Sequence, residues 1–95
     1  MFARVTIYRL KPGALAAATD LQNSVHSQIM GLPGLRQFIN VVNEDGQGYV
    51  ISLSDSAAIA NANSALIAEI WKAFAPHLEG PPTPGGYDVI ANWTN

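Results

Sequence analysis

Hydrophobic and polar positions over the first ten residues follow the pattern of a β-strand. The segment from Phe2 to Leu10 is rich in β-branched and aromatic residues, and it alternates along part of its length. Successive side chains of a strand point to opposite faces. One predicted face is aliphatic: Ala3, Val5 and Ile7. The other mixes apolar, cationic and hydroxyl groups: Phe2, Arg4, Thr6, Tyr8 and Leu10.

After the break at Lys11-Pro12-Gly13, the apolar spacing from Ala14 to Met30 becomes helical. Apolar side chains recur three or four positions apart and form one stripe: Leu15, Ala18, Leu21, Val25 and Ile29. Gly31 is expected to end this helix in the left-handed conformation, and Pro33 prevents the helix from resuming.

Two further strands are predicted over Leu35–Asn43 and Tyr49–Ser54, joined by the polar, glycine-bearing connection Glu44–Gly48. Their apolar residues fall on both faces of the sheet, because Phe38 and Val42 alternate with Ile39 and Val41.

A second helical region is predicted from about Ser56 to Ala75, where Pro76 ends it. Ser54 or Asp55 is expected to cap its first turn. The stretch Asn61-Ala62-Asn63-Ser64 is a weak helix former, so a kink or a split is expected there.

The last part of the chain is predicted as an extended connection over Leu78–Gly86 and a final strand over Tyr87–Thr94. The connection is expected because three prolines interrupt it. Strands and helices then follow the order βαββαβ, which indicates a ferredoxin-like α+β fold: a four-stranded antiparallel sheet with the helices on one face. Residues 1–95 are expected to form a single domain.

The predicted strands are apolar on both faces, although helices cover only one of them. The composition also indicates that too few charged residues are present to solvate the whole surface. Hydrophobic residues make up 48% of the chain and charged residues 13%, whereas typical proteins contain about 25% charged residues. We therefore expect a homodimer, in which two sheets pack face to face and close into a barrel. Ser, Asn, Gln and Thr offer the alternative of a polar, uncharged surface on a monomer.

Composition also argues against several classes of function. The net charge is −2 without a basic stripe, so no nucleic-acid partner is expected. The absence of cysteine excludes disulfides and thiolate metal sites. The sequence shows no signal peptide and no apolar run of about 18 residues, so a cytoplasmic protein without a membrane partner is expected.

Three short motifs resemble the dimeric α+β barrel proteins, in particular the antibiotic-biosynthesis-monooxygenase-like branch. Arg9-Leu10-Lys11-Pro12-Gly13 closes the first strand, and Gly31-Leu32-Pro33-Gly34-Leu35 opens the second with Phe38 following. Asp55-Ser56-Ala57-Ala58 stands at the start of the second helical region. The resemblance spans the whole chain in the correct order, and it rests on turn chemistry rather than catalytic chemistry.

This resemblance implies a homodimer with a pocket between the sheet and the helices of each subunit. Members include cofactor-free oxygenases of aromatic polyketides and quinols, haem-degrading enzymes and proteins without an assigned activity. The haem-degrading pattern is not matched, because Thr6 stands at its asparagine position and Ala75 near its ligand position, with His77 two residues later. The tryptophan usual before the second helical region is also missing, and Leu53 stands about there.

One set of residues is a candidate pocket lining: Arg4, Thr6, Tyr8, Asn40, Trp71 and Phe74. A cofactor-independent monooxygenase of hydroxylated aromatic or quinol-type substrates needs a dry apolar pocket and a donor that stabilises the substrate anion. The alternative is a non-catalytic ligand-binding or assembly domain with the same fold, in which these residues form an ordinary core. The sequence leaves open which face of the first strand lines the pocket. No cofactor and no metal ligand set is predicted.

The remaining candidates favour structural roles. His26 lies on the polar side of its helix, and His77 follows a helix end without a carboxylate spaced to orient it. Arg36 has the chemistry to clamp an anion, although a surface role is more common for such a residue.

Overall fold

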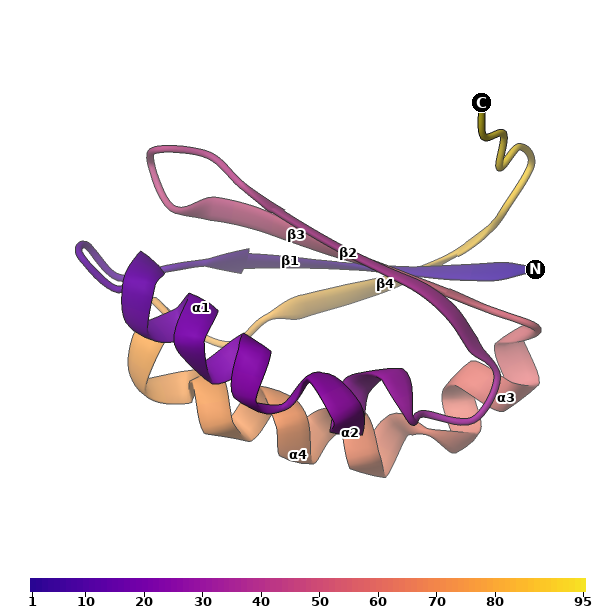
Figure 1. Cartoon of the computed structure of the whole chain (residues 1–95), viewed down its shortest axis with the longest axis horizontal. Coiled ribbons are helices and arrows are strands. Elements are labelled where there is room, and N and C mark those ends of the chain that lie inside the picture. Colours follow the sequence, from indigo (N-terminus) through magenta and orange to yellow (C-terminus); the bar gives the residue numbers. More distant parts are fainter.

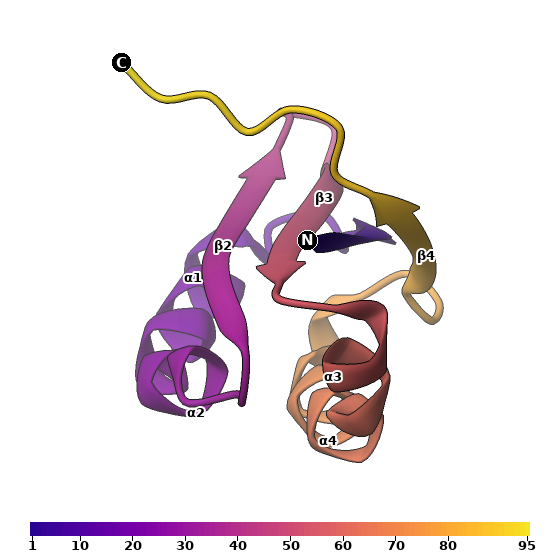
Figure 2. The ribbon, with the colours of Figure 1, turned by 90° about the vertical axis from the view of Figure 1, so that its right-hand side faces the viewer.

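The computed structural model describes residues 1–95 as one antiparallel sheet with all helices on one face (Figures 1 and 2). The elements are β1 (Phe2–Arg9), α1 (Leu15–Ser24), α2 (His26–Met30), β2 (Leu35–Val42), β3 (Gln47–Ser54), α3 (Ala57–Ala62), α4 (Ser64–Phe74), the 3-10 turn η1 (Ala75–His77) and β4 (Thr83–Asp88). The strand order is β2-β3-β1-β4, and every neighbouring pair is antiparallel. The predicted four-stranded ferredoxin-like α+β fold is confirmed.

The strand register decides which face of β1 meets the helices. Thr6 pairs with Val50 of β3, which pairs in turn with Asn40 of β2. These residues line the space between the sheet and the helices, together with Arg4 and Tyr8. The mixed face of β1 is therefore the inner face, and the aliphatic face with Val5 and Ile7 points away from the helices.

A β-bulge at the start of β2 shapes the inner face further. The register between β2 and β3 shifts between Leu35 and Gln37, which leaves Arg36 as the extra residue. As a result Leu35 and Phe38 both line the inner space although they are three residues apart.

The extra residue at this bulge forms a bidentate ion pair. Arg36 Nε and Nη2 donate to the two carboxylate oxygens of Asp55 at 2.6 and 2.9 Å. The hydrogen bond from Arg36 lowers the pKa of Asp55 below its ordinary value. Because Asp55 occupies this guanidinium, Arg36 has a structural role and is not a free anion clamp.

Both predicted helical regions are interrupted. The first divides at Val25 into α1 and α2. The second divides at Asn63, within the predicted weak stretch, so the expected split is confirmed. Asn63 is buried, and its amide donates to the carbonyl of Pro33 at 2.9 Å. This bond anchors the α3–α4 junction to the loop that leads into β2.

Gly31 is the C-cap of the first helical region, as predicted, but the left-handed conformation predicted for it was wrong. Gly31 has φ −84°, whereas Gly34 has φ 75° and takes the left-handed conformation in the turn before β2. Gly31 is favoured there by space, because a Cβ would lie 2.8 Å from the carbonyl oxygen of Ser27.

The predicted cap of the second helical region was also wrong. Ser56 caps α3, and its hydroxyl accepts from the backbone N–H of Ile59 at 3.2 Å. Ser54 is still part of β3, where it pairs with Phe2 of β1. The side chain of Asp55 binds Arg36.

The last strand lies earlier in the chain than the sequence predicts. β4 spans Thr83–Asp88 and pairs with β1, with Pro84 opposite Thr6, whereas residues 90–95 form no regular element. Prolines argued against a strand in this stretch, but β4 is an edge strand, where a residue without an N–H is tolerated. Residues beyond β4 extend on the side of the sheet away from the helices (Figures 1 and 2).

The core lies between the inner face of the sheet and the helices. Its buried members are Tyr8, Leu10, Ala18, Val50 and Leu78. No large side chain in the chain is completely buried, so this core is thin. None of the helices combines the length and the apolar composition that a membrane crossing requires.

Gly48 allows the ring of Tyr8 to lie across the neighbouring strand, because a Cβ at this position would overlap the phenol ring. Gly48→Ala is therefore expected to lower the free energy of unfolding by about 1–3 kcal/mol, as overpacking does elsewhere. Urea unfolding measures this loss. In a Tyr8→Ala background the same substitution is expected to cost far less. An equal cost in both backgrounds would contradict this position of the ring.

Candidate functional site

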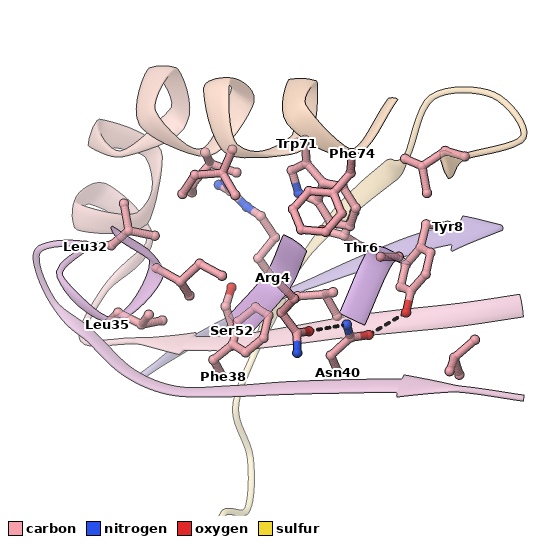
Figure 3. Close-up of a pocket in the computed structure, with 18 of the residues that line it drawn as sticks. Arg4, Thr6, Tyr8, Leu32, Leu35, Phe38, Asn40, Ser52, Trp71 and Phe74 are labelled. Atoms are coloured by element: carbon pink, nitrogen blue, oxygen red, sulfur yellow. Dashed lines mark hydrogen bonds between the residues drawn. The ribbon is translucent and has the colours of Figure 1, made fainter. Parts of the chain in front are cut away.

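The inner space contains a partly open cavity of about 290 Å³ (Figure 3). Sixteen of its 24 lining residues are hydrophobic, so it suits a ligand with an apolar body. Its volume is at the lower end of the range for small-molecule pockets, about 300–1,000 Å³.

All six residues that the sequence singled out line this cavity. β1 contributes Arg4, Thr6 and Tyr8 from alternate positions of its inner face, and β2, the edge strand on the far side of β3, contributes Asn40. Trp71 and Phe74 face them from α4, one helical turn apart. The structure thus brings the set together, while a role of these residues in binding a ligand stays a prediction.

A chain of two hydrogen bonds crosses the sheet end of the cavity (Figure 3). The Tyr8 hydroxyl donates to Oδ1 of Asn40 at 2.6 Å, and Nδ2 of Asn40 donates to Oε1 of Gln22 in α1, also at 2.6 Å. Burial raises the pKa of Tyr8 above its ordinary value of 10.0, against the smaller opposing effect of the Asn40 bond. Tyr8 is therefore a neutral phenol at physiological pH.

This chain fixes what each group offers to a ligand. The phenol proton of Tyr8 is directed to Asn40, so its oxygen offers acceptor lone pairs. The second N–H of the Asn40 amide has no partner in the chain, and it is the free donor at this end. Gln22 is not among the candidate residues of the sequence analysis. Its position one turn after Ala18, within the apolar stripe, is the signal that could have located it.

Three aromatic rings form one wall of the cavity. The rings of Tyr8 and Trp71 have centroids 5.7 Å apart at an interplanar angle of 52°, and Trp71 meets Phe74 edge to face at 6.0 Å and 60°. Such tilted contacts hold the rings in fixed orientations. The wall therefore offers a preformed surface for a flat apolar molecule.

Arg4 is the only charged residue that lines the cavity. Its Nη2 donates to Oδ1 of Asn61 in α3 at 3.0 Å, and no carboxylate lies within ion-pair distance. No aspartate, glutamate, lysine or histidine belongs to the lining, so the cavity has no side chain that could act as a general base near neutral pH.

The two histidines lie apart from this site. His26 is exposed at the start of α2, and His77 belongs to η1 and does not line the cavity. A haem in the cavity would therefore find no histidine ligand there. Nowhere do three or more His, Cys, Asp or Glu side chains converge as a metal site would require.

Comparison with solved structures identifies the fold. A provisionally named antibiotic biosynthesis monooxygenase from Nitrosomonas europaea is 16% identical, with a TM-score of 0.78 over 96% of this chain and 100% of that chain. A protein of unknown function from the same organism is 19% identical, with a TM-score of 0.81 over 99% of this chain and 93% of the other. The chain has the antibiotic-biosynthesis-monooxygenase-like fold. The resemblance noted in the sequence is confirmed at this level.

A third structure with this fold, a provisionally named antibiotic biosynthesis monooxygenase from Caulobacter crescentus, is 15% identical, with a TM-score of 0.78 over 95% of this chain and 90% of the other. Neither a family model nor a curated protein matches the sequence. At such identities the antibiotic-biosynthesis-monooxygenase-like fold is shared, but the site must be judged from its own residues. Leu53, where the resemblance placed the missing tryptophan, pairs with Ala3 on the outer face, and Trp71 supplies the indole of the cavity.

Proposed function

We propose that the chain binds a small hydroxylated aromatic or quinol-type molecule in this cavity and oxygenates it without a cofactor. The observation that carries the proposal is an apolar cavity with an aromatic wall and with its free donors, Asn40 and Arg4, set into that lining. Donors that are fixed before the reaction stabilise a developing oxyanion most effectively. The names of the structural neighbours support the same class of reaction.

An anthrone illustrates the balance of the proposed reaction. The substrate loses a proton from its CH₂ carbon to solvent water, and the resulting anion places its charge on the carbonyl oxygen, where Asn40 donates. The carbanion transfers electrons to O₂ and forms a C–O bond, giving a hydroperoxide. Loss of water from the hydroperoxide leaves a new carbonyl. One oxygen atom ends in the product and one in water, and all electrons come from the substrate.

One observation favours a second candidate, a ligand-binding protein without catalytic activity. The cavity lining contains no base to remove the substrate proton, and Tyr8 stays protonated. Oxygenation would then depend on the acidity of the substrate itself, whereas binding needs only the shape and donors already present.

The two candidates differ in oxygen uptake. Purified protein is incubated with a panel of anthrones and quinols while dissolved oxygen and product are followed. The proposal expects uptake above the buffer rate for at least one anthrone, with one carbonyl formed per O₂. Binding of the same compounds without any uptake would overturn the oxygenase and support the ligand-binding protein.

We also propose that the single domain of residues 1–95 works as a homodimer that pairs its sheets into an α+β barrel. Large apolar side chains are exposed on the outer face: Ile7, Ile39, Val41, Tyr49 and Tyr87. The chain exposes 6102 Å², whereas a compact monomer of 10.1 kDa would expose about 5,300 Å². The excess supports burial by a second copy. The expected cytoplasmic location stays a prediction.

A further inference from the structure

Arg4 lies at the boundary between the cavity and a second hollow. This is an open surface groove between α4 and the segment Gly80–Gly86. Five residues line both the cavity and the groove: Arg4, Thr6, Ile67, Trp71 and Leu78. The two spaces therefore adjoin along these side chains. In Figure 3 the side chain of Arg4 extends from the sheet toward the helices.

The guanidinium of Arg4 is the least used of the three in the chain. Arg36 binds both oxygens of Asp55, and Arg9 donates to the carbonyl of Asp45 and to the side chain of Gln47. Arg4 makes one side-chain hydrogen bond, to the neutral amide of Asn61. An arginine carries five N–H donors in a planar fork that matches a carboxylate. Most of these donors are thus free at the boundary between the cavity and the groove.

The immediate surroundings of Arg4 contain no acidic side chain. Its neighbour on β4 is Gly86, over which the ring of Phe2 lies, and its neighbour on β3 is the small Ser52. Among the residues of the groove, Glu69 is the one acidic group, and it lies beside the exposed Lys72 at 3.9 Å. No carboxylate therefore competes for the guanidinium.

We propose that the natural ligand is an amphipathic acid, with its apolar aromatic body in the cavity and its anionic group on Arg4 at the mouth of the groove. This inference rests on the proposal that the cavity binds a small molecule, and it adds the class of that molecule. Arg4 binds the anionic group, and the aromatic wall contacts the apolar body.

The test compares two bicyclic probes of nearly equal shape, 2-naphthoate, which is ionised at pH 7, and the neutral 2-naphthamide. A Trp93→Phe background leaves Trp71 as the only tryptophan, so its fluorescence reports on the cavity. We expect naphthoate to bind about tenfold more tightly, the effect of a hydrogen bond to a charged group. Arg4→Met keeps the apolar stem, removes the charge and is expected to abolish this preference while leaving naphthamide binding within about twofold.

Lys72→Met is the matched control, because Lys72 lines the groove but not the cavity and should leave the preference intact. Equal binding of both probes to the wild type, no binding of either, or a preference that survives Arg4→Met would each overturn the inference. An acid preference lost with Arg4 but without oxygen uptake on any substrate would support the inference and reject the oxygenase alone. Oxygen uptake without an acid preference would do the reverse.

Discussion

Asn40→Leu is expected to lower kcat for oxygenation of an anthrone by about 10²–10³, the usual loss when one donor to an oxyanion is removed. The substitution keeps the approximate size of the side chain and removes the one N–H at the sheet end that no group of the chain accepts. Since that donor acts on charge that develops during the reaction, KM should change much less than kcat. Initial rates of oxygen uptake over a range of substrate concentrations separate the two parameters.

Two neighbouring substitutions are the controls for this result. Tyr8→Phe removes the bond that orients the Asn40 carbonyl, and Gln22→Met removes the acceptor of its N–H. Both leave the Asn40 amide in place, so each should lower kcat by less than Asn40→Leu does. If Asn40→Leu has the kcat of the wild type, Asn40 does not stabilise the reacting anion, and the proposed mechanism loses its main donor.

The sequence predicts the fold well because hydrophobic periodicity dominates in β1, β2, β3 and the two helical regions. It fails at the ends of elements, where the outcome depends on partners far along the chain. Asp55 does not cap α3 because Arg36 binds it from the bulge in β2. β4 forms through prolines because it pairs only with β1, at the edge of the sheet. Neither partner is visible in a local window of residues.

The candidate site could be proposed from residue types and alternation, but its orientation could not. Either face of β1 could pack against the helices, since one is aliphatic and the other contains Phe2, Tyr8 and Leu10. Gly48 and Gly86 help to decide between them. Each sits opposite an inner residue of β1, and each leaves space for an aromatic ring, Tyr8 over Gly48 and Phe2 over Gly86. Because the sequence analysis assigned both glycines to connections, Glu44–Gly48 and Leu78–Gly86, this signal for the inner face was not used.

Ile7→Asp is expected to convert a dimer into a monomer. Ile7 lies on the central strand β1, its side chain is 43% exposed on the outer face, and it pairs there with Tyr49. In a two-fold pairing of sheets, each copy would bury one unpaired carboxylate, at a cost of several kcal/mol each. The dissociation constant should then rise on the order of 10³-fold or more. Light scattering should give twice the 10.1 kDa chain mass for the wild type and the chain mass for the variant.

Leu66→Asp is the matched control, since Leu66 is 55% exposed on α4 and lines neither the cavity nor the groove. It should leave the dimer intact, because only the outer face of the sheet is expected to be covered.

Ile7 also lies between Thr6 and Tyr8, whose side chains line the cavity. A pairing that holds β1 from outside therefore also stabilises the inner wall, and the Ile7→Asp monomer should bind naphthoate more weakly although it lacks no cavity residue. If the wild type has a mass of 10.1 kDa by light scattering at micromolar concentration, it is a monomer. The homodimer and its proposed effect on binding in the cavity would then both be rejected.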